Sequence, residues 1–138
     1  MIIGILFWLL ALLSCVYAAT FGGRDGLWAA SLIIAASVLT VPAANLDHSW
    51  QQVETARMGV DIALLIGLYA LTLHSRPYWP IWMTGFHLIA VVTHVSVMLV
   101  PHYTPAIYRA MQSIWALPVL LSMVIGIAMD RQRASRGS

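Results

Sequence analysis

Apolar residues fill five long stretches of the chain, and only a few polar or turn-forming residues separate one stretch from the next. The stretches cover residues 2–20, 27–46, 53–73, 80–100 and 105–129. Each is close to the roughly 20 residues that an α-helix needs to cross a bilayer core about 30 Å thick. No alternation of apolar and polar residues with a period of two occurs, so strands are not predicted. The pattern predicts an all-α membrane protein, an up-down bundle of five transmembrane helices.

The breaks between the stretches predict the connectivity and the orientation of this bundle. Loops this short place consecutive helices antiparallel and side by side, so we expect a single transmembrane domain over residues 1–138 with a basic tail over 130–138. Arginines are concentrated in the loops on the side of the C-terminus, which predicts a cytoplasmic C-terminus and an N-terminus outside. Five arginines share that side, namely Arg24, Arg76, Arg131, Arg133 and Arg136, and two lie opposite, Arg57 and Arg109. Pro42 interrupts the second stretch, and a proline bends a membrane helix more often than it ends one.

Composition agrees with a membrane protein and excludes several classes of function. Hydrophobic residues make up 61% of the 138 residues and charged residues 9%, whereas a soluble domain carries roughly 25% charged residues. So few charges cannot cover a surface that faces water, which excludes a soluble enzyme, a nucleic-acid binder and a disordered tail. The one cysteine, Cys15, lies within an apolar run, and no internal disulfide can form.

The third stretch opens with three charged residues, Glu54, Arg57 and Asp61, spaced three and four apart. These spacings place all three on one helix face, where neighbours can form ion pairs. Asp61 lies about 12 Å past Val53 at 1.5 Å per residue. A lone charge at such a depth costs at least about 2.5 kcal/mol, so Asp61 must face protein or trapped water. Three interpretations remain open: an Arg57–Asp61 pair that fixes packing, a carboxylate that handles protons or ions, and a charge that docks a partner.

The fourth stretch carries two histidines, His87 and His94, seven residues apart on one helix face. The separation of about 10.5 Å along the helix is too long for both rings to bind one metal ion, and no metal site is predicted. A haem held by two histidines would need a histidine on a facing helix of another chain. The alternatives are histidines hydrogen-bonded within the bundle, ligation of a haem or a bacteriochlorophyll-type pigment, and proton transfer. We expect no cofactor as the default.

Depth along the helices predicts that these groups meet in one layer. His94 lies about 9 Å from the outer end of its helix and Arg109 about 6 Å from the start of the fifth. The predicted buried polar cluster therefore comprises Glu54, Arg57, Asp61, His94 and Arg109. We expect Asp61 to lie within hydrogen-bonding reach of Arg57, His94 or Arg109, either in a sealed network or at the floor of an outward-facing cavity. The inner half, which by the same measure holds His87, is apolar apart from that residue, Tyr69 and small hydroxyls, and this argues against a simple channel.

Two further patterns predict packing and membrane contacts. Gly59, Ala63 and Gly67 recur every four residues on the face of the third helix turned away from Asp61. Small residues at this spacing let another helix approach closely. Tyr78, Trp79 and Trp82 fall where an aromatic belt at the inner membrane surface is expected.

Three segments carry a resemblance to a group of known proteins. The stretch 53–61, the run 76–80 and Phe86-His87 with His94 resemble small polytopic inner-membrane proteins of alphaproteobacteria. The resemblance covers about residues 45–125 and implies a multi-pass location in the bacterial inner membrane. It implies no activity, because none is known for that group.

The sequence is best explained by a non-enzymatic membrane subunit that packs into a homo-oligomer or a larger complex of respiratory or photosynthetic type. Its expected partners are membrane lipids and either itself or other membrane subunits, and not nucleic acid. One alternative is a small transporter or pore former of the holin type. The other is a haem- or pigment-binding protein that uses His87 or His94.

Overall fold

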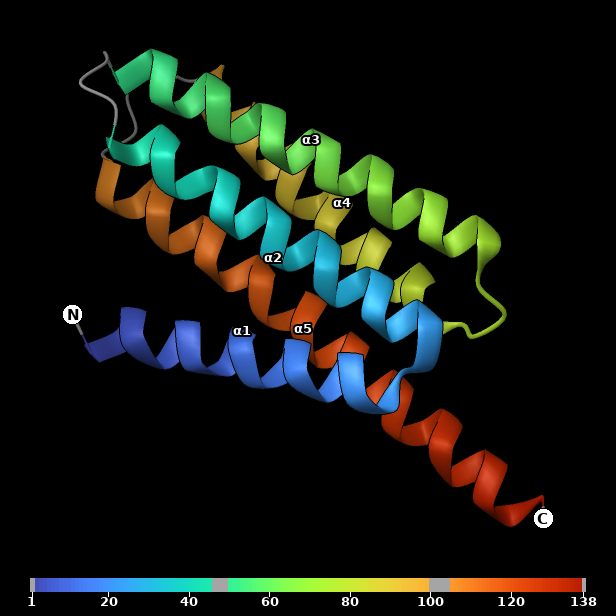
Figure 1. The fold of residues 1–138 in the computed structure, drawn as a ribbon. Helices are drawn as coiled ribbons and strands as arrows, with labels where there is room; N and C mark the ends of the chain where they lie inside the picture. The colour runs from blue at the N-terminus through green and yellow to red at the C-terminus, as the bar shows by residue number, and fades with distance from the viewer. Residues whose placement is uncertain (1, 46–49, 100–104, 138) are drawn as a thin grey trace.

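The computed structural model is all-helical over the residues that it describes (Figure 1). The backbone is described for residues 2–45, 50–99 and 105–137, and the side chains for residues 5–40, 55–96, 98–99 and 114–137. Within these ranges lie five helices and no strand. They are α1 (Ile2–Phe21), α2 (Gly23–Asn45), α3 (Trp50–His74), α4 (Trp79–Met98) and α5 (Pro105–Arg136).

The helices close into a ring. Each helix packs against the next in the chain, and α5 packs back against α1. The turn between α1 and α2 and the loop between α3 and α4 lie at the same end of the bundle, and α5 runs past that end (Figure 1). We call it the C-terminal end. The contacts between consecutive helices follow from the short connections, which force neighbours in sequence to be neighbours in space.

Two boundaries differ from the sequence prediction. The second helix begins at Gly23 instead of residue 27, so a single residue, Gly22, separates α1 from α2. Gly23 has a φ of +60°, a backbone conformation that glycine adopts without steric cost. The basic tail predicted over residues 130–138 is helical up to Arg136. No glycine or proline interrupts it before Gly137, and arginines in a last turn interact favourably with the helix dipole.

Among the described side chains, the completely buried apolar ones lie toward the C-terminal end, where α4 and α5 approach closely. Leu68, Met83 and Met123 are completely buried and belong to one hydrophobic cluster. A Cβ atom added to Gly126 would overlap the Cβ of Trp79, so the absence of a side chain on α5 makes room for this tryptophan. The prediction that Trp79 belongs to an aromatic belt is therefore wrong. Trp79 is 4% exposed, whereas Trp82 is 64% exposed.

Among the residues with described side chains, two helical segments are long and apolar enough to cross a membrane, Thr55–His74 and Ile114–Arg136. A third described segment, Ile5–Phe21, is also apolar. The five-helix bundle is thus established for the described residues, and membrane association is indicated by two of its helices.

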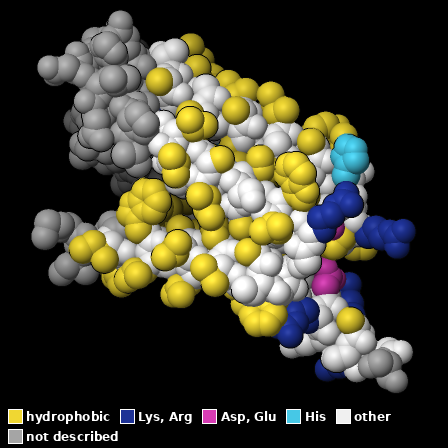
Figure 2. All heavy atoms as spheres, viewed as in Figure 1, with side chains coloured by type: hydrophobic (Ala, Val, Ile, Leu, Met, Phe, Trp, Pro, Cys, Tyr) yellow, Lys and Arg dark blue, Asp and Glu magenta, His cyan; other side chains and the backbone are white. Residues whose placement is uncertain are grey.

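Large apolar side chains cover much of the outer surface. Figure 2 shows them along the length of the described part, while charged side chains gather at the C-terminal end. Leu13, Val38, Ile66, Trp82 and Leu121 are all more than half exposed, and between them they represent every helix. Soluble monomers rarely expose contiguous apolar patches of this kind.

Candidate functional site

A cavity of about 340 Å³ lies inside the ring, and every helix contributes to its wall. Most of the lining is apolar or small, such as Ala11, Ala90 and Ala116. The polar lining comes from α2, α3 and α4, and consists of Ser37, Thr40, Arg57, Asp61 and His87. At roughly 30 Å³ per molecule, this space would hold about ten waters. The apolar bundle therefore contains a partly open cavity with ionisable groups on its wall.

Asp61 is the centre of the contacts between α3 and α4. Its carboxylate oxygen Oδ2 lies 2.9 Å from Nδ1 of His94. Its backbone carbonyl oxygen lies 3.0 Å from Nε2 of His87 and accepts a hydrogen bond from it. An ionised carboxylate only accepts hydrogen bonds, so with Asp61 charged the Nδ1–H of His94 is the donor. Both histidines of α4 thus bind the same residue of α3.

The two partners of the carboxylate–imidazole pair are buried to different degrees. The side chain of His94 is 0% exposed, whereas that of Asp61 is 32% exposed. Asp61 lines the cavity and His94 lies behind it in the α3–α4 interface. The pair therefore connects the cavity to a fully enclosed imidazole, an arrangement suited to holding a proton or a cation next to the cavity.

Three completely buried apolar side chains lie between the cavity and the C-terminal end of the bundle: Leu68, Met83 and Met123. We call these three residues the apolar seal. Antiparallel packing of α3 and α4 sets this order, because Leu68 follows Asp61 by two turns and Met83 precedes His87 by one. At the level of the seal, the hydroxyls of Thr72 and Thr84 lie 2.9 Å apart across the same two helices. Among the described residues, the polar lining does not continue through the seal.

The structure brings together part of the predicted buried polar cluster. Asp61 and His94 are in contact, and Arg57 borders the same cavity one turn before Asp61. The side chains of Glu54 and Arg109 lie outside the described residues.

Sequence reasoning missed the position of His87. Depth counting placed it in the apolar half, whereas it reaches back to the carbonyl of Asp61. Its position seven residues from His94, on the same helix face, was the available signal. The cavity-lining hydroxyls of Ser37 and Thr40 were also missed. Each donates to a carbonyl of its own helix, so nothing in the sequence distinguished them from packing residues.

The two histidines differ as candidate ligands for a haem or pigment. His94 is completely enclosed, so binding a macrocycle would require α3 and α4 to separate. His87 borders the cavity. Its Nε2 atom contacts Asp61, so its other ring nitrogen, Nδ1, is the candidate ligand atom. Over the part of the chain with described side chains, no group of three His, Cys, Asp or Glu residues is placed to hold a metal ion.

The predicted small-residue face of α3 is used only in part within the chain. A Cβ on Gly67 would lie 2.8 Å from Cδ2 of Leu32, so α2 packs closely there. Gly59 has no atom within 4 Å of such a Cβ, and Ala63 is exposed. The part of this face nearer the start of α3 is open on the outer surface.

Comparison with known proteins adds no family: no protein-family model, no curated protein and no solved structure matches the chain. The functional interpretation therefore depends on the cavity, the Asp61–His94 pair and the apolar outer surface.

Proposed function

We propose that the chain is a non-enzymatic, multi-pass protein of the bacterial inner membrane, with all five helices crossing and the C-terminus in the cytoplasm. The exposed apolar side chains on every helix support this proposal, because such a surface is more stable in contact with lipid than with water. Helix α4 illustrates the point, since Thr84, His87 and His94 are at least partly buried while Ile81, Leu88 and Val92 are exposed.

Within that membrane protein, we propose that the cavity binds a small polar solute or ion and that Asp61 is its proton- or ion-binding group. The single observation that carries this proposal is the cavity wall, where Arg57, Asp61 and His87 occur together in an otherwise apolar bundle. Ionisable residues inside a membrane bundle are costly and typically mark the path of a substrate or a proton. The apolar seal favours a small transporter over a pore former, since a solute would pass only if the helices rearranged.

An assay in proteoliposomes tests this role. A pH-sensitive dye trapped inside reports how fast an imposed pH gradient decays. Vesicles with the unaltered protein are expected to lose the gradient faster than empty vesicles, and Asp61→Asn is expected to slow this decay at least about tenfold, since proton-transfer groups contribute factors of 10² or more. The asparagine keeps the shape of the side chain but cannot carry the proton.

Ser96→Ala provides the matched control, because Ser96 is an exposed residue of α4 whose hydroxyl bonds to the carbonyl of Val92 in its own helix. It is expected to leave the decay unchanged. Equal rates for the unaltered protein, Asp61→Asn and empty vesicles would reject a proton-coupled role.

A second function, an accessory subunit of a homo-oligomer or larger membrane complex, is favoured by one observation. Gly59 and Ala63 form an open small-residue surface on α3 that no other described helix covers. Such surfaces let a partner helix approach closely in lipid. The native mass in mild detergent distinguishes this function from a monomeric transporter, and the absorption spectrum of the same preparation reports a bound haem or pigment.

A further inference from the structure

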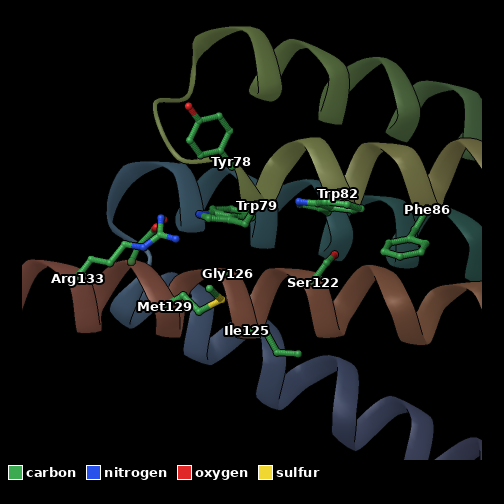
Figure 3. A pocket seen from close by; sticks show the side chains of 10 residues that line it. Tyr78, Trp79, Trp82, Phe86, Ser122, Ile125, Gly126, Met129 and Arg133 are labelled. Carbon is green, nitrogen blue, oxygen red and sulfur yellow. The ribbon is translucent and has the colours of Figure 1, made fainter.

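A second pocket lies between α4 and α5 at the C-terminal end of the bundle, separate from the central cavity. It has a volume of about 300 Å³. Figure 3 shows Trp79, Trp82 and Phe86 in succession along α4 on one side and the α5 residues opposite, with Arg133 at one end. The exposed Trp82 and Tyr78 open this pocket to the outer surface. Aromatic side chains thus make up much of one wall.

The other wall carries a charge of each sign. Asp130 and Arg133, one turn apart on α5, both line the pocket. A carboxylate on the wall of a pocket lined mostly by apolar and aromatic side chains favours a cationic group as its partner. Tryptophan and tyrosine rings also attract cations over their faces.

We propose that this pocket binds the headgroup of a zwitterionic phospholipid of the phosphatidylethanolamine type. The ammonium group lies against Asp130 and the aromatic wall, and the phosphate is bound by the guanidinium of Arg133. The acyl chains lie along the exposed apolar surface beside Ile125. This inference depends on the membrane location proposed above.

Charge complementarity selects this class of lipid over others. A headgroup with one positive and one negative group matches the pair formed by Asp130 and Arg133, whereas an anionic phosphatidylglycerol would satisfy Arg133 and leave Asp130 without a cation. Position supports the same choice. Tyr78 and Trp82 are exposed beside the pocket at the end of the bundle, and interfacial aromatic residues typically lie at the level of lipid headgroups.

Native mass spectrometry tests the proposal on the full chain in detergent. The protein is incubated with equal amounts of phosphatidylethanolamine and phosphatidylglycerol, and the bound fraction of each lipid is measured. The unaltered protein is expected to retain phosphatidylethanolamine in preference. Asp130→Asn and Trp82→Ala are each expected to lower its retention about tenfold, the effect of losing one charge-assisted contact.

Two control variants test whether the loss of lipid retention is specific to residues of this pocket. Trp8→Ala removes a tryptophan of α1 that is also more than half exposed and does not line this pocket, and Arg136→Gln removes an arginine in the same last turn as Arg133. Both are expected to retain the lipid. Circular dichroism confirms that Asp130→Asn and Trp82→Ala remain helical, and Trp82 is exposed enough that its loss leaves the core intact.

Three outcomes would overturn the inference: unchanged retention in both Asp130→Asn and Trp82→Ala, equal retention of phosphatidylglycerol, or displacement of the lipid by free phosphoethanolamine at the same concentration. The last result would assign the pocket to a soluble zwitterion. Flotation with vesicles separates this inference from the proposed membrane location. Protein that floats but shows no preference rejects the lipid site alone, whereas protein that does not float rejects both.

Discussion

Replacing His94 with alanine is expected to lower the free energy of unfolding by about 3 kcal/mol, the lower end of what truncating a buried ring costs. The side chain of His94 has no exposed surface, so its loss leaves a void in the α3–α4 interface. It also removes the donor that lies 2.9 Å from the Asp61 carboxylate. The lower end applies because the cavity leaves Asp61 about a third exposed. Unfolding in mixed micelles, followed by circular dichroism, measures the change.

Two further variants show whether the pair itself is responsible. Ser96→Ala changes an exposed residue two positions along α4 and is expected to alter stability by less than about 0.5 kcal/mol. The double variant His94→Ala with Asp61→Asn is expected to be more stable than the sum of its single changes predicts, by at least about 0.5 kcal/mol. If His94→Ala unfolds at the same point as Ser96→Ala, the contact contributes nothing to the fold.

Met83→Ala is expected to have a comparable effect on stability and a second effect on permeability. Met83 is completely buried in the apolar seal, and a methionine-to-alanine change at such a site costs about 2–5 kcal/mol. The void also thins the barrier between the cavity and the C-terminal end of the bundle. In the proteoliposome assay, the imposed pH gradient is therefore expected to decay faster than with the unaltered protein.

Met129 provides the comparison for this change, because it is a methionine of α5 that is about half exposed. Met129→Ala is expected to alter stability little and to leave the decay unchanged. A Met83→Ala protein that behaves like Met129→Ala in both measurements would mean that the seal does not close the cavity.

The sequence predicted the helices and, as one of three alternatives, the contact between Asp61 and His94. Apolar stretches of helical length predicted the number of helices and their antiparallel order, because short loops leave few alternatives. The rise of 1.5 Å per residue placed Asp61 and His94 at one level, and the structure brings them to 2.9 Å. Periodicity and length are local properties, so they can be read without knowledge of the packing.

What could not be predicted depends on how the helices pack. Trp79 was expected at the membrane surface, but the missing side chain of Gly126 on a neighbouring helix admits it to the core. His87 joins the site because the register of α3 against α4 brings its ring to the carbonyl of Asp61. The packing of α5 against α1, which closes the ring around the cavity, is not indicated by any pattern in the sequence of either helix. These features are set by pairs of residues far apart in the chain.

The central claim, that a polar cavity lies inside a bundle surrounded by lipid, is tested most directly by thiol accessibility on α4. In a Cys15→Ala background, Ala90→Cys places a thiol on the cavity wall and Val92→Cys places one on the exposed apolar surface. Sealed membrane vesicles are treated with a small hydrophilic methanethiosulfonate, and labelling is followed by mass spectrometry. We predict that Ala90→Cys reacts and Val92→Cys does not, since water reaches the cavity but not the lipid-facing side. Labelling of Val92→Cys without labelling of Ala90→Cys would contradict both the cavity and the membrane location.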